Sequence, residues 1–122
     1  MPRSRMFAVA LFLLIFVSGC AKPAPAATSG KLRVVSTVSP ITNIIQNVGG
    51  DRIDVTGIVP EGVNSHTFEP APSDARLLAQ ADIIFVNGLL LEEPTIKLAE
   101  ANKAEGVEIV SLGEQTVTPA EY

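Results

Sequence analysis

The sequence predicts an α/β domain built on a parallel sheet with flanking helices. Three observations support this fold class. Short runs of β-branched apolar residues recur after residue 30, segments with helix start signals lie between them, and glycine or proline marks most of the changes. Apolar residues make up 47% of the 122 positions, which is enough to bury one core. The order of strand, helix, strand, loop and helix, strand, helix, strand is typical of parallel strands joined by crossovers.

The first half of the domain should contain two strands and one helix. The stretch LRVVSTV at residues 32–38 predicts a buried strand, and IDVTGIV at residues 53–59 predicts a second one. Between them, Ser39 suits an N-cap and Pro40 a first helical position. The apolar side chains of this helix follow the helical spacing, and two glycines end it: Ile41, Ile44, Ile45 and Val48, then Gly49 and Gly50.

The second half repeats the alternation. Ser73 can cap a helix that has Asp74 in its first turn. DIIFVNG at residues 82–88 predicts a third strand, and Pro94 suits the start of a weakly amphipathic helix that runs to about residue 103. VEIVSL at residues 107–112 then predicts a fourth strand, which completes a sheet of four.

The amino terminus carries export signals. Arg3 and Arg5 precede an apolar run at residues 7–17, which predicts a secretory signal peptide over residues 1–19 that is too short to span a bilayer comfortably. The run ends at VSGC, which resembles a bacterial lipoprotein processing box. That resemblance implies a lipid on Cys20 and an extracytoplasmic protein held on the membrane; an ordinary cleaved signal with an incidental cysteine is the alternative. The Pro- and Ala-rich residues 20–30 read as a flexible tether.

Charge and motifs narrow the function. The chain after Cys20 has seven basic and thirteen acidic residues, so its net charge is −6. Nucleic acid and anionic lipid are therefore not expected as partners of the folded part, whereas cations are, although an acidic surface is often only a solvated one. No nucleotide-binding motif or catalytic set is found, so we do not expect an enzyme. The pair Glu92 and Glu93 reads as a solvated helix start.

His66 is the single histidine of the chain and lies in VPEGVNSHTFEP, residues 59–70. This loop follows the carboxyl end of the second predicted strand, and parallel sheets bind ligands at that edge. The segments after the other three strands should reach the same edge. Residue type alone leaves two interpretations open, an ordinary surface histidine or a metal ligand.

The residues around His66 carry a family resemblance. The pattern P-x-G-x-x-x-H-x-[FY]-E-P-x-P-S-D, followed by Ala-Asp, a strand and N-G-L-x-L-E, resembles the N-terminal lobe of the two-lobe zinc- and manganese-binding solute-binding proteins of bacterial ABC transporters. This lipoprotein group includes streptococcal surface adhesins. The matching positions are Pro60, Gly62, His66, Phe68, Glu69, Pro70, Pro72, Ser73, Asp74, Ala81, Asp82, Asn87, Gly88, Leu89, Leu91 and Glu92.

The resemblance implies a function for His66. It implies that His66 is a metal ligand, that the transported ion is Zn²⁺ or Mn²⁺, and that a membrane permease with its ATPase receives the ion from a monomeric binding protein. Glu69 then has either a supporting role beside the metal or a structural role in its turn. Asn64 and Ser65 stand where many relatives have Asp-Pro, and Leu90 where they have Gly, which puts the loop conformations in doubt.

One histidine does not complete such a site. In the family the metal lies between two lobes, so we expect residues 31–122 to form an incomplete N-terminal lobe that is not competent alone. Transition-metal sites generally need at least three protein ligands, and Glu61, Glu69, Glu92 or Glu114 could in principle assist. Two other functions stay open, a solute-binding protein for an organic or chelated ligand and a surface adhesion lipoprotein.

Overall fold

The structure is a computed structural model in which residues 30–118, 120 and 121 are described. The expected signal peptide at residues 1–19, the expected lipidation site Cys20 and the tether up to residue 29 lie outside the described residues. Within the described part, no helix is long and apolar enough to cross a membrane.

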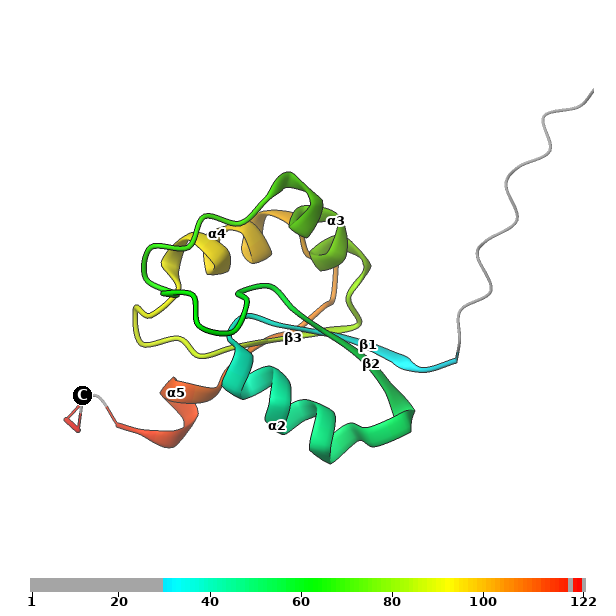
Figure 1. The fold of residues 1–122 in the computed structure, drawn as a ribbon, viewed down its shortest axis with the longest axis horizontal. Coiled ribbons are helices and arrows are strands. Elements are labelled where there is room, and N and C mark those ends of the chain that lie inside the picture. The colour runs from blue at the N-terminus through cyan, green and yellow to red at the C-terminus, as the bar shows by residue number, and fades with distance from the viewer. Residues whose placement is uncertain (1–29, 119, 122) are drawn as a thin grey trace, which may run out of the picture.

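Four parallel strands form one sheet in the order β2-β1-β3-β4 (Figure 1), which confirms the predicted fold class. Each strand is shorter than the sequence predicts, and β1 and β2 lose their last two residues, where the chain turns away from the sheet. The regular ladder gives way to single hydrogen bonds such as Val59 N to the Thr37 carbonyl. The strands are β1 (Leu32–Ser36), β2 (Ile53–Gly57), β3 (Ile83–Val86) and β4 (Ile109–Ser111).

Helices cover both faces of the sheet. In Figure 1, α2 and α5 lie below the sheet and α3 and α4 lie above it. The chain leaves β1 through α2 to reach β2 on one side, then returns through α3 to β3 on the other side. This reversal makes a topological switch point between β1 and β3, where α/β sheets open a crevice at their carboxyl ends. The bounds are α2 (Ser39–Gly49), η2 (Gly50–Arg52), α3 (Pro72–Gln80), α4 (Glu93–Asn102) and α5 (Leu112–Thr116).

Three helices begin earlier than the sequence suggests; α4 begins at Glu93, one residue before Pro94. Val38, and not Ser39, is the N-cap of α2. The expected cap Ser73 is the second residue of α3, which begins at Pro72 because the fixed φ of proline suits a first helical position. Asp74 stabilises this start, since its carboxylate accepts the Ala71 N–H at 2.8 Å.

The core has two parts, one on each face of the sheet. Between the sheet and helices α3 and α4 lie the side chains of seven buried residues, among them Leu78 of α3, Ile84 of β3 and Ala99 of α4. Under α2 lies a smaller cluster, Val38, Ile41 and Val59, on which Phe68 and Leu91 also pack.

The apolar stripe predicted for α2 is buried only in part. Ile41 is buried, but Ile44 and Val48 are 60% and 74% exposed. The reason is position: α2 packs mainly beside β2, which is the edge strand, so one flank of the helix has no sheet beneath it.

Candidate metal site

His66 lies on the loop between β2 and α3, at the carboxyl edge of the sheet, as the sequence predicts. Its side chain is exposed, and its backbone N–H donates to Asn64 Oδ1 at 3.0 Å. Asn64 thus closes a local turn through its side chain. Two residues further on, Phe68 packs against the buried clusters on both sides of the sheet and anchors the loop.

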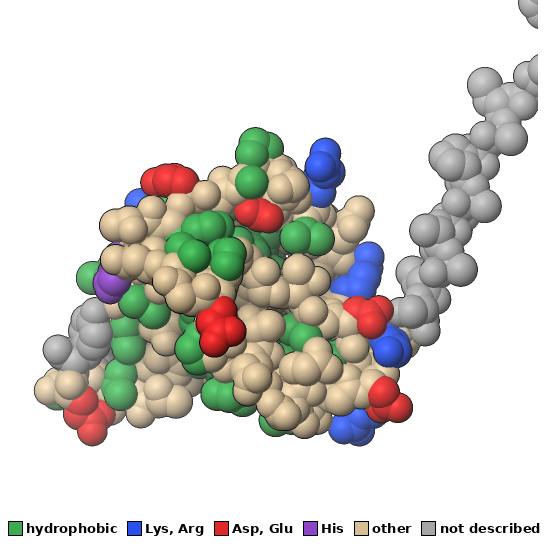
Figure 2. All heavy atoms as spheres, viewed as in Figure 1, with side chains coloured by type: hydrophobic (Ala, Val, Ile, Leu, Met, Phe, Trp, Pro, Cys, Tyr) green, Lys and Arg blue, Asp and Glu red, His purple; other side chains and the backbone are tan. Residues whose placement is uncertain are grey.

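The edge that carries His66 has an acidic bias. The four segments that follow the strands, residues 37–40, 58–71, 87–92 and 112–118, contain no Lys or Arg. In Figure 2 the histidine lies on the left of the molecule, and most Lys and Arg side chains lie on the right. A cation therefore meets carboxylates and one imidazole here, without basic side chains from these segments to repel it. The exposed carboxylates on these segments are Glu61, Glu69 and Glu114.

A cavity of about 280 Å³ lies at the switch point. It draws on the ends of β1, β2 and β3 and on the loop that carries His66, which contributes the neighbouring Ser65. Its position between the first and third strands is where the topology predicts a ligand crevice. The lining residues are Val38, Ser39, Pro40, Ile41, Val59, Pro60, Val63, Ser65, Asn87 and Leu91.

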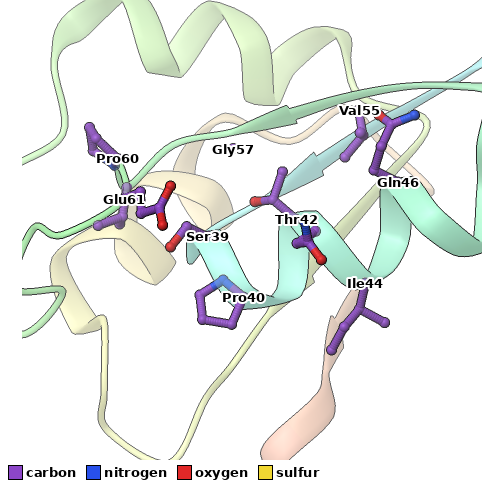
Figure 3. Close-up of a pocket in the computed structure, with 11 residues that line it drawn as sticks. Ser39, Pro40, Thr42, Ile44, Gln46, Val55, Gly57, Pro60 and Glu61 are labelled. Carbon is purple, nitrogen blue, oxygen red and sulfur yellow. The ribbon is translucent and has the colours of Figure 1, made fainter.

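A second hollow, a groove of about 780 Å³, runs between α2 and β2 (Figure 3). Hydroxyl and amide side chains of α2, including Thr42 and Gln46, line one wall. Thr42 lies so close to Gly57 of β2 that a Cβ at Gly57 would be 2.6 Å from the Thr42 hydroxyl. Ser39 and Glu61 lie near each other in the close-up, at the end toward the loop of His66. The groove contains one carboxylate and no imidazole, so it lacks the ligands of a transition-metal site.

The described residues do not complete a metal site. No group of three or more His, Cys, Asp or Glu side chains within residues 30–118, 120 and 121 is placed to hold one ion. Glu69 is exposed, and its side chain makes no hydrogen bond or ion pair within this part of the chain. Glu114 accepts the Leu89 N–H at 3.3 Å. His66 alone can bind a transition metal only weakly.

Glu92 is not the solvated residue that the sequence suggests. Its exposure is 0%. Its Oε1 accepts hydrogen bonds from the Thr37 hydroxyl and the Asn87 N–H, both at 2.6 Å. The prediction was wrong for a physical reason. Helix α4 begins at Glu93, so Glu92 is its N-cap, and the side chain points into the core, where it meets Thr37 at the end of β1. The sequence contains one indication that Glu92 is buried: in the run LLLEEP, three leucines directly precede this glutamate.

The turn before Glu92 is backbone-strained. Gly88, Leu89 and Leu90 have φ of 76°, 53° and 61°, three successive left-handed residues. The left-handed conformation costs a residue with a side chain roughly 1–2 kcal/mol. Gly88 has no alternative, because a Cβ there would lie 2.0 Å from Ser111 Oγ. Leucine at position 90 therefore keeps the left-handed conformation that a glycine would adopt without strain.

Comparison with known proteins assigns the chain. Residues 34–121 match the family described as "Zinc-uptake complex component A periplasmic". The metal ABC transporter substrate-binding lipoprotein FimA of Streptococcus parasanguinis is 39% identical over 113 residues, and the match covers 87% of this chain and 37% of that protein. The manganese ABC transporter substrate-binding lipoprotein PsaA of Streptococcus anginosus is 49% identical over 84 residues, covering 67% and 27% respectively.

A solved structure agrees with these relatives. The Mn-bound periplasmic metal binding protein from Candidatus Liberibacter asiaticus superposes with a TM-score of 0.66 at 34% identity, over 71% of this chain and 32% of that chain. These matches cover between 27% and 37% of the length of those proteins, so this chain spans about a third of their length or less. The family match covers nearly all of the described residues, and this chain belongs to the family of zinc-uptake complex component A periplasmic proteins.

Proposed function

We propose that this chain supplies part of an extracytoplasmic binding site for a divalent transition metal, Zn²⁺ or Mn²⁺, with His66 as a metal ligand. The observation that carries the proposal is the exposed imidazole at the carboxyl edge of the sheet, beside the switch-point cavity and among segments with carboxylates and no basic residue. Imidazole nitrogen and carboxylate oxygen are the donors that Zn²⁺ and Mn²⁺ accept.

The proposed role is capture and transfer without catalysis. Relatives described as substrate-binding lipoproteins of metal ABC transporters support a permease and its ATPase as the partners that receive the ion. A lipid on Cys20 and the tether that follows would hold the domain near that permease. Because one imidazole and scattered carboxylates bind a metal weakly, tight binding needs further ligands in addition to His66.

Nuclear magnetic resonance of the single histidine tests the site directly. In the untagged chain labelled with ¹³C-histidine, only His66 gives an imidazole signal, so metal bound elsewhere does not obscure the result. We expect Zn²⁺ to shift this signal in a saturable manner. Paramagnetic Mn²⁺ should broaden the backbone amide signals of residues 64–68 before those of the amino edge of the sheet.

Two variants control this experiment. His66→Asn should abolish the selective broadening, whereas Thr67→Ala, which changes the neighbouring exposed side chain, should keep it. A His66 signal that does not move at any Zn²⁺ concentration would remove this residue from the site. That outcome would instead favour an organic or chelated ligand in the switch-point cavity.

A further inference from the structure

The hydrogen bonds of Glu92 join two strands across the switch point. Thr37 directly follows β1 and Asn87 directly follows β3, and both donate to the same carboxylate oxygen. A buried carboxylate is strongly unfavourable unless donors compensate it, and hydrogen bonds to a charged acceptor are stronger than neutral ones. The N-terminus of α4 adds a favourable dipole beside the N-cap. The carboxylate therefore holds the two strand ends together.

The same carboxylate holds one end of the left-handed turn. Asn87 directly precedes the three left-handed residues 88–90, and Leu91 separates them from Glu92. The bond from Asn87 N to Glu92 Oε1 closes this turn from outside, and the Leu91 N–H to Gly88 carbonyl bond of 3.1 Å closes it from inside. A strained backbone of this kind persists only where the surroundings hold it.

The turn is also held from the side of α5. The Gly113 N–H donates to the Asn87 carbonyl at 2.8 Å, and Glu114 Oε1 accepts the Leu89 N–H at 3.3 Å. These contacts fix the outer side of the turn, whereas Glu92 fixes the side toward β1. The turn is therefore held by a buried carboxylate on one side and an exposed one on the other.

The turn forms one wall of the switch-point cavity. Asn87 and Leu91, the residues on either side of it, both line the cavity, and Ser65 and Val63 line it from the loop of His66. Leu91 and Phe68 pack on the same buried cluster of Val38, Ile41 and Val59. These shared contacts connect the turn to the loop that carries His66 through packed side chains.

Glu92 has one further feature that distinguishes it from an ordinary cap. Its Oε2 and the Thr95 hydroxyl are both buried and have no hydrogen-bond partner among the described residues. Among the described residues, only one oxygen of this carboxylate, Oε1, therefore accepts hydrogen bonds. An amide at this position can reproduce both bonds of Oε1, and its NH₂ group has the Thr95 hydroxyl three residues away as a candidate acceptor.

We propose that Glu92 is a positioning residue of the metal site: its buried carboxylate fixes the left-handed turn 88–90 to the end of β1 and thereby sets the cavity wall that faces the loop of His66. This inference rests on the proposed function for its link to metal. Glu92 is not itself a ligand, because it is fully buried and its Oε1 is engaged.

The test compares Glu92→Ala and Glu92→Gln with Glu93→Ala in the full chain. Glu93 is the matched control, because it is the adjacent carboxylate but is half-exposed and paired with Lys97 at 3.2 Å. Without metal, Glu92→Ala should shift the amide signals of residues 87–91 and also those of residues 63–66. With Zn²⁺, the affinity read on the His66 signal should fall below that of the wild type, because the cavity wall beside the loop of His66 has moved.

The conservative variant and the control separate positioning from folding. Glu92→Gln should restore most of the affinity, and Glu93→Ala should leave the amide signals and the affinity as in the wild type. If Glu92→Ala does not fold, Thr37→Val removes one of the two donors at nearly constant volume and should give the same shifts in smaller size. A folded Glu92→Ala or Thr37→Val chain with unchanged signals in residues 63–66 would overturn the proposal.

The experiment also separates this inference from the proposed function. A wild-type His66 signal that ignores Zn²⁺ contradicts metal binding, yet the metal-free amide signals still show whether Glu92 sets the cavity wall. Conversely, normal Zn²⁺ binding in a folded Glu92→Ala chain leaves the role of His66 intact and refutes the role of Glu92.

Discussion

Strands β1 and β3 are joined at both ends by a carboxylate, and the two junctions differ in almost every other respect. At the amino end, Asp82 accepts hydrogen bonds from the backbone N–H, Nε and a terminal guanidinium nitrogen of Arg33, at 2.8, 3.2 and 2.6 Å. At the carboxyl end, Glu92 accepts from a hydroxyl and a backbone amide, and its side chain is buried. One junction is an ion pair in water, and the other is a lone carboxylate in the core.

The difference shows that charge pairing and structural importance need not coincide. Water and salt screen the exposed pair, so even three hydrogen bonds at the amino end stabilise the fold little. At the carboxyl end, Thr37 is fully buried and Asn87 is half-buried, so losing their shared acceptor leaves the buried Thr37 hydroxyl unsatisfied. The junction with fewer bonds and no countercharge should therefore matter more to the fold.

The largest expected effect tests this comparison directly. Glu92→Ala should lower the free energy of unfolding by roughly 3 kcal/mol, because two short hydrogen bonds to one carboxylate oxygen are lost and the buried Thr37 hydroxyl stays unpaired. Asp82→Ala, which removes a carboxylate from the other end of the same two strands, should have a much smaller effect. Urea denaturation of both variants measures the difference, and equal losses would refute the comparison.

A smaller effect, of opposite sign, tests the strain at the carboxyl edge. Leu90→Gly should raise the free energy of unfolding by up to about 1 kcal/mol, because leucine at φ 61° is strained and glycine is not. The gain stays below the full strain, since glycine also makes the unfolded chain more flexible. The side chain is 66% exposed, so little packing is lost.

A leucine at the amino edge serves as the control for this prediction. Leu32 is also largely exposed but lies in β1, where its backbone is extended. Leu32→Gly should destabilise the fold by about 1 kcal/mol, because glycine weakens a strand without relieving any strain. Two losses of equal size would mean that the turn at residues 88–90 stores no strain.

The smallest effect concerns the pH dependence of the amino junction. The side-chain hydrogen bond from Arg33 lowers the pKa of Asp82, with its backbone hydrogen bond and charge acting in the same direction. A lowered pKa in the folded state means that the stabilisation is present above the ordinary aspartate pKa of about 3.9 and is lost as pH falls through the lowered value. The carboxyl ¹³C signal of Asp82 should therefore titrate below that ordinary pKa.

Substitution of the partner provides the check. Arg33→Gln should return the pKa of Asp82 toward its ordinary value, and added salt should shift the wild-type pKa in the same direction. If the Asp82 signal titrates identically in the wild type and in Arg33→Gln, the ion pair does not exist in solution. The comparison between an ion-paired junction and a buried one then no longer holds.

The sequence predicts the fold class and the place of His66 because both depend on local signals. Apolar runs, helix starts and glycine pairs mark the alternation of strands and helices, and a loop after a parallel strand must reach the carboxyl edge. Exact helix starts were less predictable, since both Ser73 and Pro72 suit the start of α3, and the structure shows that the bond from the Ala71 N–H to Asp74 goes with the start at Pro72. The predicted burial of the apolar side of α2 was wrong at Ile44 and Val48, because the helical spacing of apolar residues does not reveal that β2 is an edge strand.

The sequence by itself determined a parallel α/β domain, a histidine in a loop at its ligand edge and a resemblance to a metal-binding family. Only the tertiary structure decided that Glu92 is buried and where it is held. Its donor Thr37 lies 55 positions earlier in the chain, and the two meet because β3 passes next to β1 and not next to β2. Local patterns report the preferences of neighbouring residues, whereas burial of a charge depends on which distant strand ends come together.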